Sequence, residues 1–171
     1  MIKTGKEHLE SLRDGRVIFI GDERIEDVTT HPAFRRAAKT VAGLYDLKHQ
    51  RENREILTFQ EGDQTHSMWF LQARNKDDLR KRMAAHKLIA DQTCGMMGRS
   101  MDHVSSFVTG MSTNPSIFDT EKHKFSENIM SYYNYMKEND IFATYAVLPP
   151  QAARNPEFYQ KKNLPIPTLM V

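Results

Sequence analysis

Cysteine is almost missing from this chain, which has one, Cys94, in 171 residues. A single thiol excludes a disulfide within the chain and any metal site built from several of its own thiolates. We expect Cys94 to be a small buried apolar residue on a helix. The seven histidines are scattered without the spacing of metal ligands, so we expect no metal site.

Long apolar runs are also missing. No stretch approaches the roughly 20 residues that a membrane span needs, and the first residues lack the apolar segment of a secretory signal. Neither sign of charge dominates, because 24 Lys and Arg face 22 Asp and Glu, interspersed, with a net charge of +2. This balance gives no support to a nucleic-acid surface. We therefore expect a cytosolic protein that binds neither nucleic acid nor membrane.

The common catalytic motifs do not occur in the sequence: it has no glycine-rich dinucleotide loop, no P-loop, no His-Glu-x-x-His and no Gly-x-Ser-x-Gly. His31, beside a proline, is expected to form part of a helix start, and His86 to be a hydrogen-bonded core residue. The rest is an ordinary composition, 39% hydrophobic and 27% charged, which is sufficient for a buried core.

Apolar spacing and capping residues predict a mainly helical chain. The clearest helix starts are Thr4 followed by Glu7, a capping box, and Asn75 followed by Asp78. The predicted helices cover residues 5–13, 31–48, 76 to a break near 95–98, 100–110 and 125–139.

Three of these helices carry apolar stripes that we expect to face the core. The stripes are Phe34, Ala37, Ala38, Val41, Leu44, Tyr45 and Lys48; then Leu79, Met83, His86, Ala90, Cys94 and Met97; then Phe125, Ile129, Tyr132, Tyr133 and Met136. The basic cluster beside the second stripe is expected to be a solvated surface, and consists of Arg80, Lys81, Arg82 and Lys87.

Two short β-hairpins are predicted between the helices. The first pairs residues 16–20 with 23–28 through Gly21-Asp22, and the second pairs 56–59 with 68–71, placing Trp69 on a strand. A further strand-like run at 141–148 ends in a double proline.

The switch from helix to strand near residue 140 is the predicted domain boundary. We expect a helical domain over residues 1–140 and the start of a β-domain over 141–171. The apolar end of the chain, at 164–171, has no later segment to pair with it, so we expect a truncated protein.

The segment GMMGRSMDH at 95–103 is the most informative local feature. It places Arg99 and His103 four residues apart at the start of a predicted helix. A guanidinium stays charged at physiological pH and can hold a phenolate or a carboxylate. From spacing alone, a surface arginine at a corner between two helices is the simpler interpretation.

Six sequence blocks resemble, in order, the amino-terminal part of the 4-hydroxyphenylacetate 3-monooxygenase oxygenase family. The blocks are 4–16 (TGKEHLESLRDGR), 27–35 (DVTTHPAFR), 44–47 (LYDL), 95–100 (GMMGRS), 138–140 (END) and 150–151 (PQ). The resemblance implies the amino-terminal helical domain of an acyl-CoA-dehydrogenase-like fold, with two small hairpins and the first strand of a truncated β-domain. It also implies a homotetramer assembled through a carboxy-terminal helical bundle.

The activity implied by the resemblance is hydroxylation of a phenol, such as 4-hydroxyphenylacetate, ortho to its hydroxyl group. Family members use O₂ and reduced FAD that a separate flavin reductase delivers. The cofactor carries the difficult chemistry, and the protein positions the ring and excludes water.

The resemblance also assigns site residues. Arg99 matches the family's substrate arginine, and His103 and Tyr145 stand where the family has a tyrosine and a histidine against the phenolic oxygen. Each of these two exchanges keeps a hydrogen-bonding group at its position. Because the groups differ from those of the family, a phenol other than 4-hydroxyphenylacetate stays open as the substrate. The expected flavin contacts, with Ala153 in place of an acidic residue of the family, are Tyr145, Ala146, Val147, Gln151 and Arg154.

Two other functions are open at this point. A 4-hydroxybutyryl-CoA dehydratase of the same architecture needs an iron–sulfur cluster held by cysteines and a histidine, which Cys94 alone disfavours. A non-catalytic fragment or helical interaction module would keep the fold and bind neither flavin nor substrate. The sequence that follows Val171 separates this alternative from a truncated enzyme.

Overall fold

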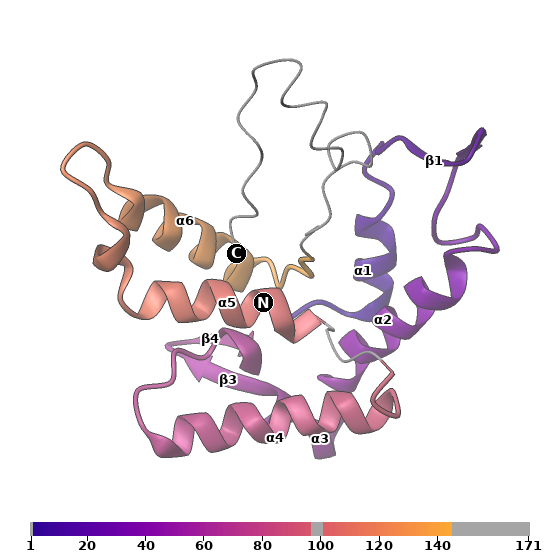
Figure 1. Cartoon of the computed structure of the whole chain (residues 1–171). Coiled ribbons are helices and arrows are strands. Elements are labelled where there is room, and N and C mark those ends of the chain that lie inside the picture. The colour runs from indigo at the N-terminus through magenta and orange to yellow at the C-terminus, as the bar shows by residue number, and fades with distance from the viewer. Residues whose placement is uncertain (1, 97–100, 145–171) are drawn as a thin grey trace.

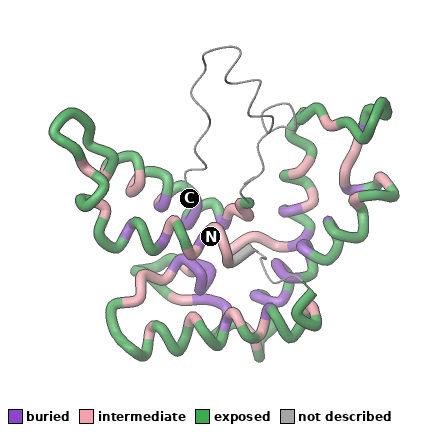
Figure 2. Tube along the Cα trace, viewed as in Figure 1, coloured by how far each residue is buried: buried purple, intermediate pink, exposed green. Residues whose placement is uncertain are grey.

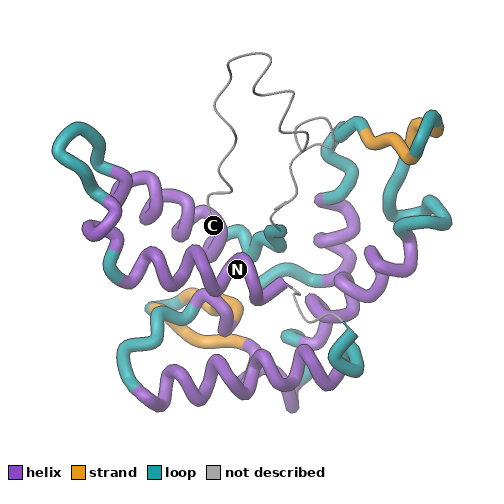
Figure 3. The backbone as a smooth tube through the Cα atoms, in the orientation of Figure 1, coloured by secondary structure: helices purple, strands orange, loops and turns teal. Residues whose placement is uncertain are grey.

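Two pairs of packed helices form the two arms of the fold, and they are Gly5–Ser11 with Arg35–Leu47 and Met101–Thr113 with Phe125–Glu138 (Figures 1 and 3). Below the arms lies a base that contains the helix Lys76–Gln92 and the second hairpin. The computed structural model describes residues 2–96 and 101–144. Its elements are α1 Gly5–Ser11, β1 Ile18–Ile20, β2 Glu23–Ile25, α2 Arg35–Leu47, α3 Arg51–Leu57, β3 Thr58–Glu61, β4 Gln64–Ser67, η1 Met68–Phe70, α4 Lys76–Gln92, α5 Met101–Thr113, η2 Pro115–Phe118 and α6 Phe125–Glu138. The predicted mainly helical fold with two hairpins is confirmed. None of the helices in the described ranges is long and apolar enough to span a membrane.

Helix α1 begins at the predicted capping box. The Thr4 hydroxyl accepts from the amide of Glu7, and the Glu7 carboxylate accepts from the amide of Thr4 at 2.7 Å. The helix ends at Ser11, two residues before the predicted end, and packs on α2 through Gly5 and His8. Leu9 and Leu12 are partly buried on the same side of the helix.

The first hairpin has the predicted turn and shorter strands. Ile18 lies opposite Ile25 and Ile20 opposite Glu23, and Gly21 supplies the positive φ of 58° that the turn requires. The hairpin projects from the arm that contains α1 and α2 (Figure 1), and the side chain of Phe19 is exposed.

The second hairpin exists, but both predicted strands were misplaced. Thr58 pairs with Ser67 and Glu61 with Gln64, so the strands run over 58–61 and 64–67. Residues 51–57 form helix α3, which was not predicted, and Trp69 lies on the short 3-10 helix η1. A short apolar run such as Met68–Phe70 fits a buried strand and a buried helical turn equally well, and periodicity cannot separate the two.

Helix α2 begins at Arg35, four residues later than predicted. His31 forms the turn before it, because its carbonyl accepts from the amides of Phe34 and Arg35 and its Nδ1 accepts from the amide of Ala33 at 3.2 Å. His31 is therefore part of a helix start, as predicted. The apolar stripe is confirmed from Ala38 to Lys48, whereas Ala37 is exposed.

The predicted buried face of α4 is wrong. Asn75 caps the helix as expected, accepting from the amides of Asp77 and Asp78, but the buried residues are Ala85 and Ile89. Leu79 is 53% exposed and Met83 68% exposed. Ala90 is also exposed and His86 is half-buried, while Met97 lies outside the described residues.

Cys94 is exposed, against the prediction of a buried helical cysteine. The physical reason is that α4 ends at Gln92 with Thr93 as its C-cap, so Cys94 lies beyond the helix. Its φ of 51° belongs to the left-handed conformation that follows many helix ends.

Helices α5 and α6 pack against each other and complete the core. Tyr133 and Met136 of α6 are buried, and the Tyr133 hydroxyl donates to the carbonyl of Phe70 at 2.7 Å. Phe125 and Tyr132, predicted on the same inner face, are largely exposed. Residues 141–144 have no regular secondary structure, and the remainder of the predicted strand at 141–148 lies outside the described residues.

The core lies where the two arms meet (Figure 2). Its buried members come from α2, α3, η1, α4 and α6, and are Val41, Leu44, Tyr45, Leu47, Leu57, Met68, Trp69, Phe70, Ala85, Ile89, Tyr133 and Met136. Two charged side chains, Lys48 and Asp140, are buried beside them.

Candidate functional site

One predicted catalytic residue, His103, lies within the described part of the chain. It occupies the first turn of α5 and is half-buried. Its ring lies edge-to-face against the ring of Phe107, with centroids 5.1 Å apart and an interplanar angle of 82°. The other predicted site residues lie outside the described residues, and they are Arg99, Tyr145, Ala146, Val147, Gln151 and Arg154.

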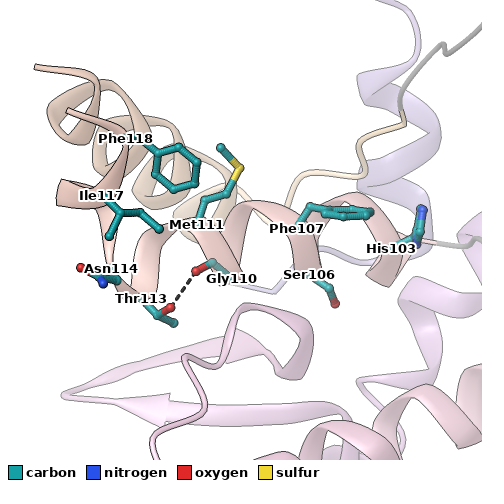
Figure 4. Close-up of a pocket in the computed structure, with 9 residues that line it drawn as sticks. All are labelled: His103, Ser106, Phe107, Gly110, Met111, Thr113, Asn114, Ile117 and Phe118. Atoms are coloured by element: carbon teal, nitrogen blue, oxygen red, sulfur yellow. Dashed lines mark hydrogen bonds between the residues drawn. The ribbon is translucent and has the colours of Figure 1, made fainter. Parts of the chain in front are cut away.

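An open groove of about 550 Å³ runs along α5 from His103 to η2 (Figure 4). Figure 4 shows Met111 and Phe118 close together at one end and His103 at the other. The apolar side chains of the groove are Phe107, Met111, Ile117 and Phe118, and its polar residues are His103, Ser106, Thr113 and Asn114. Such a lining suits an aromatic ring with one polar substituent.

The far wall of the groove was not predicted from the sequence. Asn114 and Pro115 are typical of a loop, whereas residues 115–118 form a 3-10 helix that presents Ile117 and Phe118. This short helix lies mainly against α6, and Ile117 is 68% exposed. The apolar pair after Asn-Pro was the signal available in the sequence.

The opposite face of α5 is held by hydrogen bonds to the chain after β4. The Thr109 hydroxyl donates to the carbonyl of Trp69 at 3.1 Å, and the Gln72 amide donates to the carbonyl of Ser112 at 3.1 Å. These bonds fix the rotation of α5 about its axis. They therefore determine which of its residues face the groove.

Arg82 links α4 to α5. Its guanidinium donates to the carbonyl of Leu71 at 2.6 Å and to the hydroxyl of Ser106 at 2.8 Å. The prediction that Arg82 belongs to a solvated basic surface is therefore wrong. Arg80, on the outer side of the helix, is exposed as expected, and it pairs with Asp77.

A buried polar cluster lies at the end of α6. The Asp140 carboxylate accepts from the Lys48 ammonium, from the Ser67 hydroxyl at 2.6 Å and from the amide of Lys3 at 2.9 Å. The carbonyl of Asp140 accepts from the Tyr45 hydroxyl at 2.8 Å. Sequence reasoning missed this cluster, apart from noting that the apolar stripe of α2 ends in a lysine.

Burial changes the acid–base properties around this cluster. It lowers the pKa of Lys48 to about 8, although the neighbouring Asp140 opposes the change. It also lowers the pKa of His8 to about 4, with help from the positive charges of Lys3 and Lys48. His8 is thus a neutral ring at pH 7, stacked on Tyr45 with centroids 4.7 Å apart.

The described residues contain no group of three or more His, Cys, Asp or Glu side chains placed to hold a metal ion. The histidines instead have local partners. The Nδ1 of His66 lies 3.3 Å from the carbonyl of Lys137, for example, and burial lowers the pKa of this ring.

Comparison with known proteins identifies the same family over most of the chain. The family model described as "4-hydroxyphenylacetate 3-hydroxylase N terminal" matches residues 4–168. The oxygenase component of 4-hydroxyphenylacetate 3-monooxygenase from Thermus thermophilus is 40% identical over 155 residues, which are 90% of this chain and 31% of that protein. The oxygenase component of 4-nitrophenol 2-monooxygenase from a Rhodococcus species is 35% identical over 156 residues, 89% of this chain and 29% of that protein.

A solved structure has the same fold over the same region. The oxygenase component of 4-hydroxyphenylacetate 3-monooxygenase, in complex with FAD and 4-hydroxyphenylacetate, superposes with a TM-score of 0.82 and 40% identity. The superposition covers 91% of this chain and 32% of the solved one. The chain thus spans about a third of the length of the relatives it matches.

Proposed function

The chain belongs to the 4-hydroxyphenylacetate 3-hydroxylase family, and from this membership we propose that the protein is the oxygenase component of a two-component aromatic hydroxylase. It would hydroxylate a phenol ortho to its hydroxyl group, with O₂ and reduced FAD. The observation that carries the proposal is the match over residues 4–168, which extends from the first helix to beyond the candidate flavin residues. A match of this extent favours the hydroxylase over both the dehydratase and the non-catalytic module.

The phenol-binding residues in this proposal are Arg99, His103 and Tyr145. Arg99 would hold the phenolic oxygen through its charge and favour the phenolate, which is the more nucleophilic form of the ring. His103 supports this assignment by its position, at the end of an apolar groove and against Phe107. An imidazole can donate to or accept from a phenolic oxygen, depending on its tautomer.

The proposed flavin site begins with Tyr145, on the segment that follows residues 141–143. When bound, reduced FAD supplies the electrons and activates O₂ for transfer of one oxygen atom to the ring. The donor types fit this cofactor, because the Arg154 guanidinium suits a pyrophosphate and the Gln151 amide can both donate and accept. The backbone of Ala146 and Val147 would complete the contact. This assignment also implies the domain boundary after residue 140.

The substrate class proposed is a phenol with a para substituent. The relatives include enzymes named for 4-hydroxyphenylacetate and for 4-nitrophenol, so membership of the family does not fix the substituent. The pair His103 and Tyr145, in place of the family's tyrosine and histidine, keeps two hydrogen-bonding groups for the hydroxyl. We further propose a separate flavin reductase as partner, a homotetramer as the assembly and the cytoplasm as the location.

The test of the proposed function is product formation by the intact protein supplied with enzymatically reduced FAD. A panel of para-substituted phenols is incubated with it and the products are separated by chromatography. We expect a catechol from at least one phenol. Release of peroxide without any oxygenated product from the whole panel would contradict the proposal.

The matched variants are Arg99→Ala and Arg99→Lys. Arg99→Ala should raise KM for the phenol by at least an order of magnitude while FAD affinity stays within about twofold, since only the substrate loses its charged partner. Arg99→Lys should recover part of the loss, because it restores the charge without the planar donor pair. An equal loss of phenol and FAD binding would mean that Arg99 supports the fold instead.

A further inference from the structure

The chain that leaves α6 is fixed by a buried ion pair. Asp140, the second residue after the helix, has a positive φ of 45°, which turns the backbone away from the helix axis. Its carboxylate is held by the ammonium of Lys48, the hydroxyl of Ser67 and the amide of Lys3. Lys48 is 0% exposed and Asp140 is 1% exposed, so water does not compete for these contacts.

The next residues are fixed by the end of α2 and by α1. Tyr45 donates its hydroxyl to the carbonyl of Asp140 at 2.8 Å. The ring of His8 lies edge-on to Phe142, with centroids 6.2 Å apart. Residues 141–143 are partly buried against the hydrophobic core. Four separate parts of the chain, namely the amino-terminal segment, α1, α2 and β4, thus determine the path of residues 140–143.

Stability alone does not account for an ion pair at this position. Removing two charges from water costs several kcal/mol per ion, on the order of what their attraction returns, and well-packed apolar side chains often serve equally well. An apolar contact, however, permits sliding and rotation. Three donors on one carboxylate define the position and direction of a backbone much more narrowly.

We propose that Lys48 and Asp140 are positioning residues of the oxygenase site, because they hold residues 140–143, from which the chain continues directly to the proposed site residue Tyr145. The inference rests on the proposed function, since it assigns a role toward the site that contains Tyr145. Neither residue touches substrate or cofactor in this proposal. They act through the backbone, from Asp140 to the start of the flavin-binding segment.

The central variant is Asp140→Asn, which removes the charge and keeps the size and a preference for positive φ. Its control is Glu61→Gln, the same chemical change in the pair between Lys137 and Glu61, whose atoms lie 2.5 Å apart and whose carboxylate side chain is 57% exposed. Lys137 is also buried and lies on α6, but this pair joins α6 to β3 rather than to residues 140–143. If either single change prevents folding, the combined variant Lys48→Met with Asp140→Asn takes its place. This variant removes both charges and leaves no unpaired ion.

The measurements use the intact protein well below the unfolding temperature of every variant. Coupling is the amount of catechol formed per reduced FAD consumed. We expect Asp140→Asn to lower kcat/KM on the order of tenfold and to release more peroxide. The reason is that a small misplacement of a reacting group lowers the rate of the chemical step strongly. Glu61→Gln should keep wild-type coupling. Equal coupling in the two variants, or wild-type coupling in Asp140→Asn, would overturn the proposal.

Backbone hydrogen exchange separates this inference from the proposed function, because it needs no turnover. Exchange of the amides at 141–144 should rise at least tenfold in Asp140→Asn and in the combined variant, and stay unchanged in Glu61→Gln. Unchanged exchange in Asp140→Asn would overturn the positioning role of Lys48 and Asp140, even if the variant is active. An inactive wild-type protein would overturn the hydroxylase assignment, and with it the role in an oxygenase site, whatever the exchange shows.

Discussion

We predict that replacing glycine by alanine changes the free energy of unfolding in opposite directions at Gly5 and Gly43. At Gly5, in the first turn of α1, an added Cβ would lie 2.4 Å from the carbonyl oxygen of Ala42 and 2.6 Å from the Asp46 carboxylate, closer than the 3.0 Å that real Cβ atoms respect. The helix cannot move away freely, because the Gly5 amide donates to that carboxylate at 2.6 Å. Overpacking costs about 1–3 kcal/mol and alanine returns at most about 1 kcal/mol in helix propensity, so Gly5→Ala should destabilise by about 1–2 kcal/mol.

Gly43 is the matched control, in the interior of α2 one residue after Ala42. Nothing lies within 4 Å of a Cβ built there, so Gly43→Ala should stabilise the protein by roughly 0.5–1 kcal/mol. Urea titration followed by circular dichroism measures both changes in the free energy of unfolding. If Gly5→Ala were neutral or stabilising, the close packing of α1 on α2 would be incorrect.

Two further predictions concern buried polar groups. Burial lowers the pKa of His8 to about 4 from 6.5 in the unfolded chain, so its contribution to stability is complete above pH 6.5 and is lost as the pH falls toward 4. Between pH 7 and pH 5 this amounts to about 2 kcal/mol, and a His8→Phe variant, whose ring can still stack on Tyr45, should lack that part of the pH dependence in thermal unfolding. Arg82→Met should destabilise by about 1–3 kcal/mol, because it leaves the carbonyl of Leu71 without its donor, whereas Arg80→Met on the exposed side of α4 should change the free energy of unfolding by less than about 0.5 kcal/mol. Equal effects of the two arginine variants, or a His8→Phe protein as sensitive to acid as wild type, would contradict the corresponding prediction.

The parts of the fold that the sequence predicted well are those with a local cause. The capping box at Thr4, the cap at Asn75 and the turn at Gly21 each depend on residues within four positions of one another. A pattern of that length is visible in the sequence without any knowledge of tertiary contacts. The family resemblance had the same basis, since each of its blocks is a continuous segment.

The inner face of α4 was missed because tertiary contacts override periodicity. Leu79 and Met83 form a regular apolar stripe, yet the helix is rotated so that Ala85 and Ile89 face the core. Arg82 explains the rotation, because its bonds to Leu71 and Ser106 require the side of α4 that bears it to face α5. No property of α4 alone contains that information.

The buried ion pair was unpredictable for a different reason. Lys48 and Asp140 are 92 positions apart, and each alone resembles an ordinary surface charge at a helix end. The sequence indicated only that an apolar stripe ended in a lysine. A buried charge of this kind needs a partner, and the partner can be found only when the fold has brought α2 and the end of α6 together.

The chain from Ser67 to Gln72 connects both halves of the candidate site. Ser67 holds Asp140, and the carbonyls of the following residues accept from Thr109 of α5, Tyr133 of α6 and Arg82 of α4, while Gln72 donates to Ser112 of α5. His103 is carried by α5, and Tyr145 follows the segment that Asp140 fixes. The placement of α5, which carries His103, and the hold on Asp140 therefore both depend on this stretch of six residues. The short 3-10 helix suits this role better than the predicted strand. It ends after one turn, so the carbonyls of Trp69, Phe70 and Leu71 have no partner within the helix and can accept from three neighbouring helices. A strand paired in a sheet would have used carbonyls of this stretch in its own ladder.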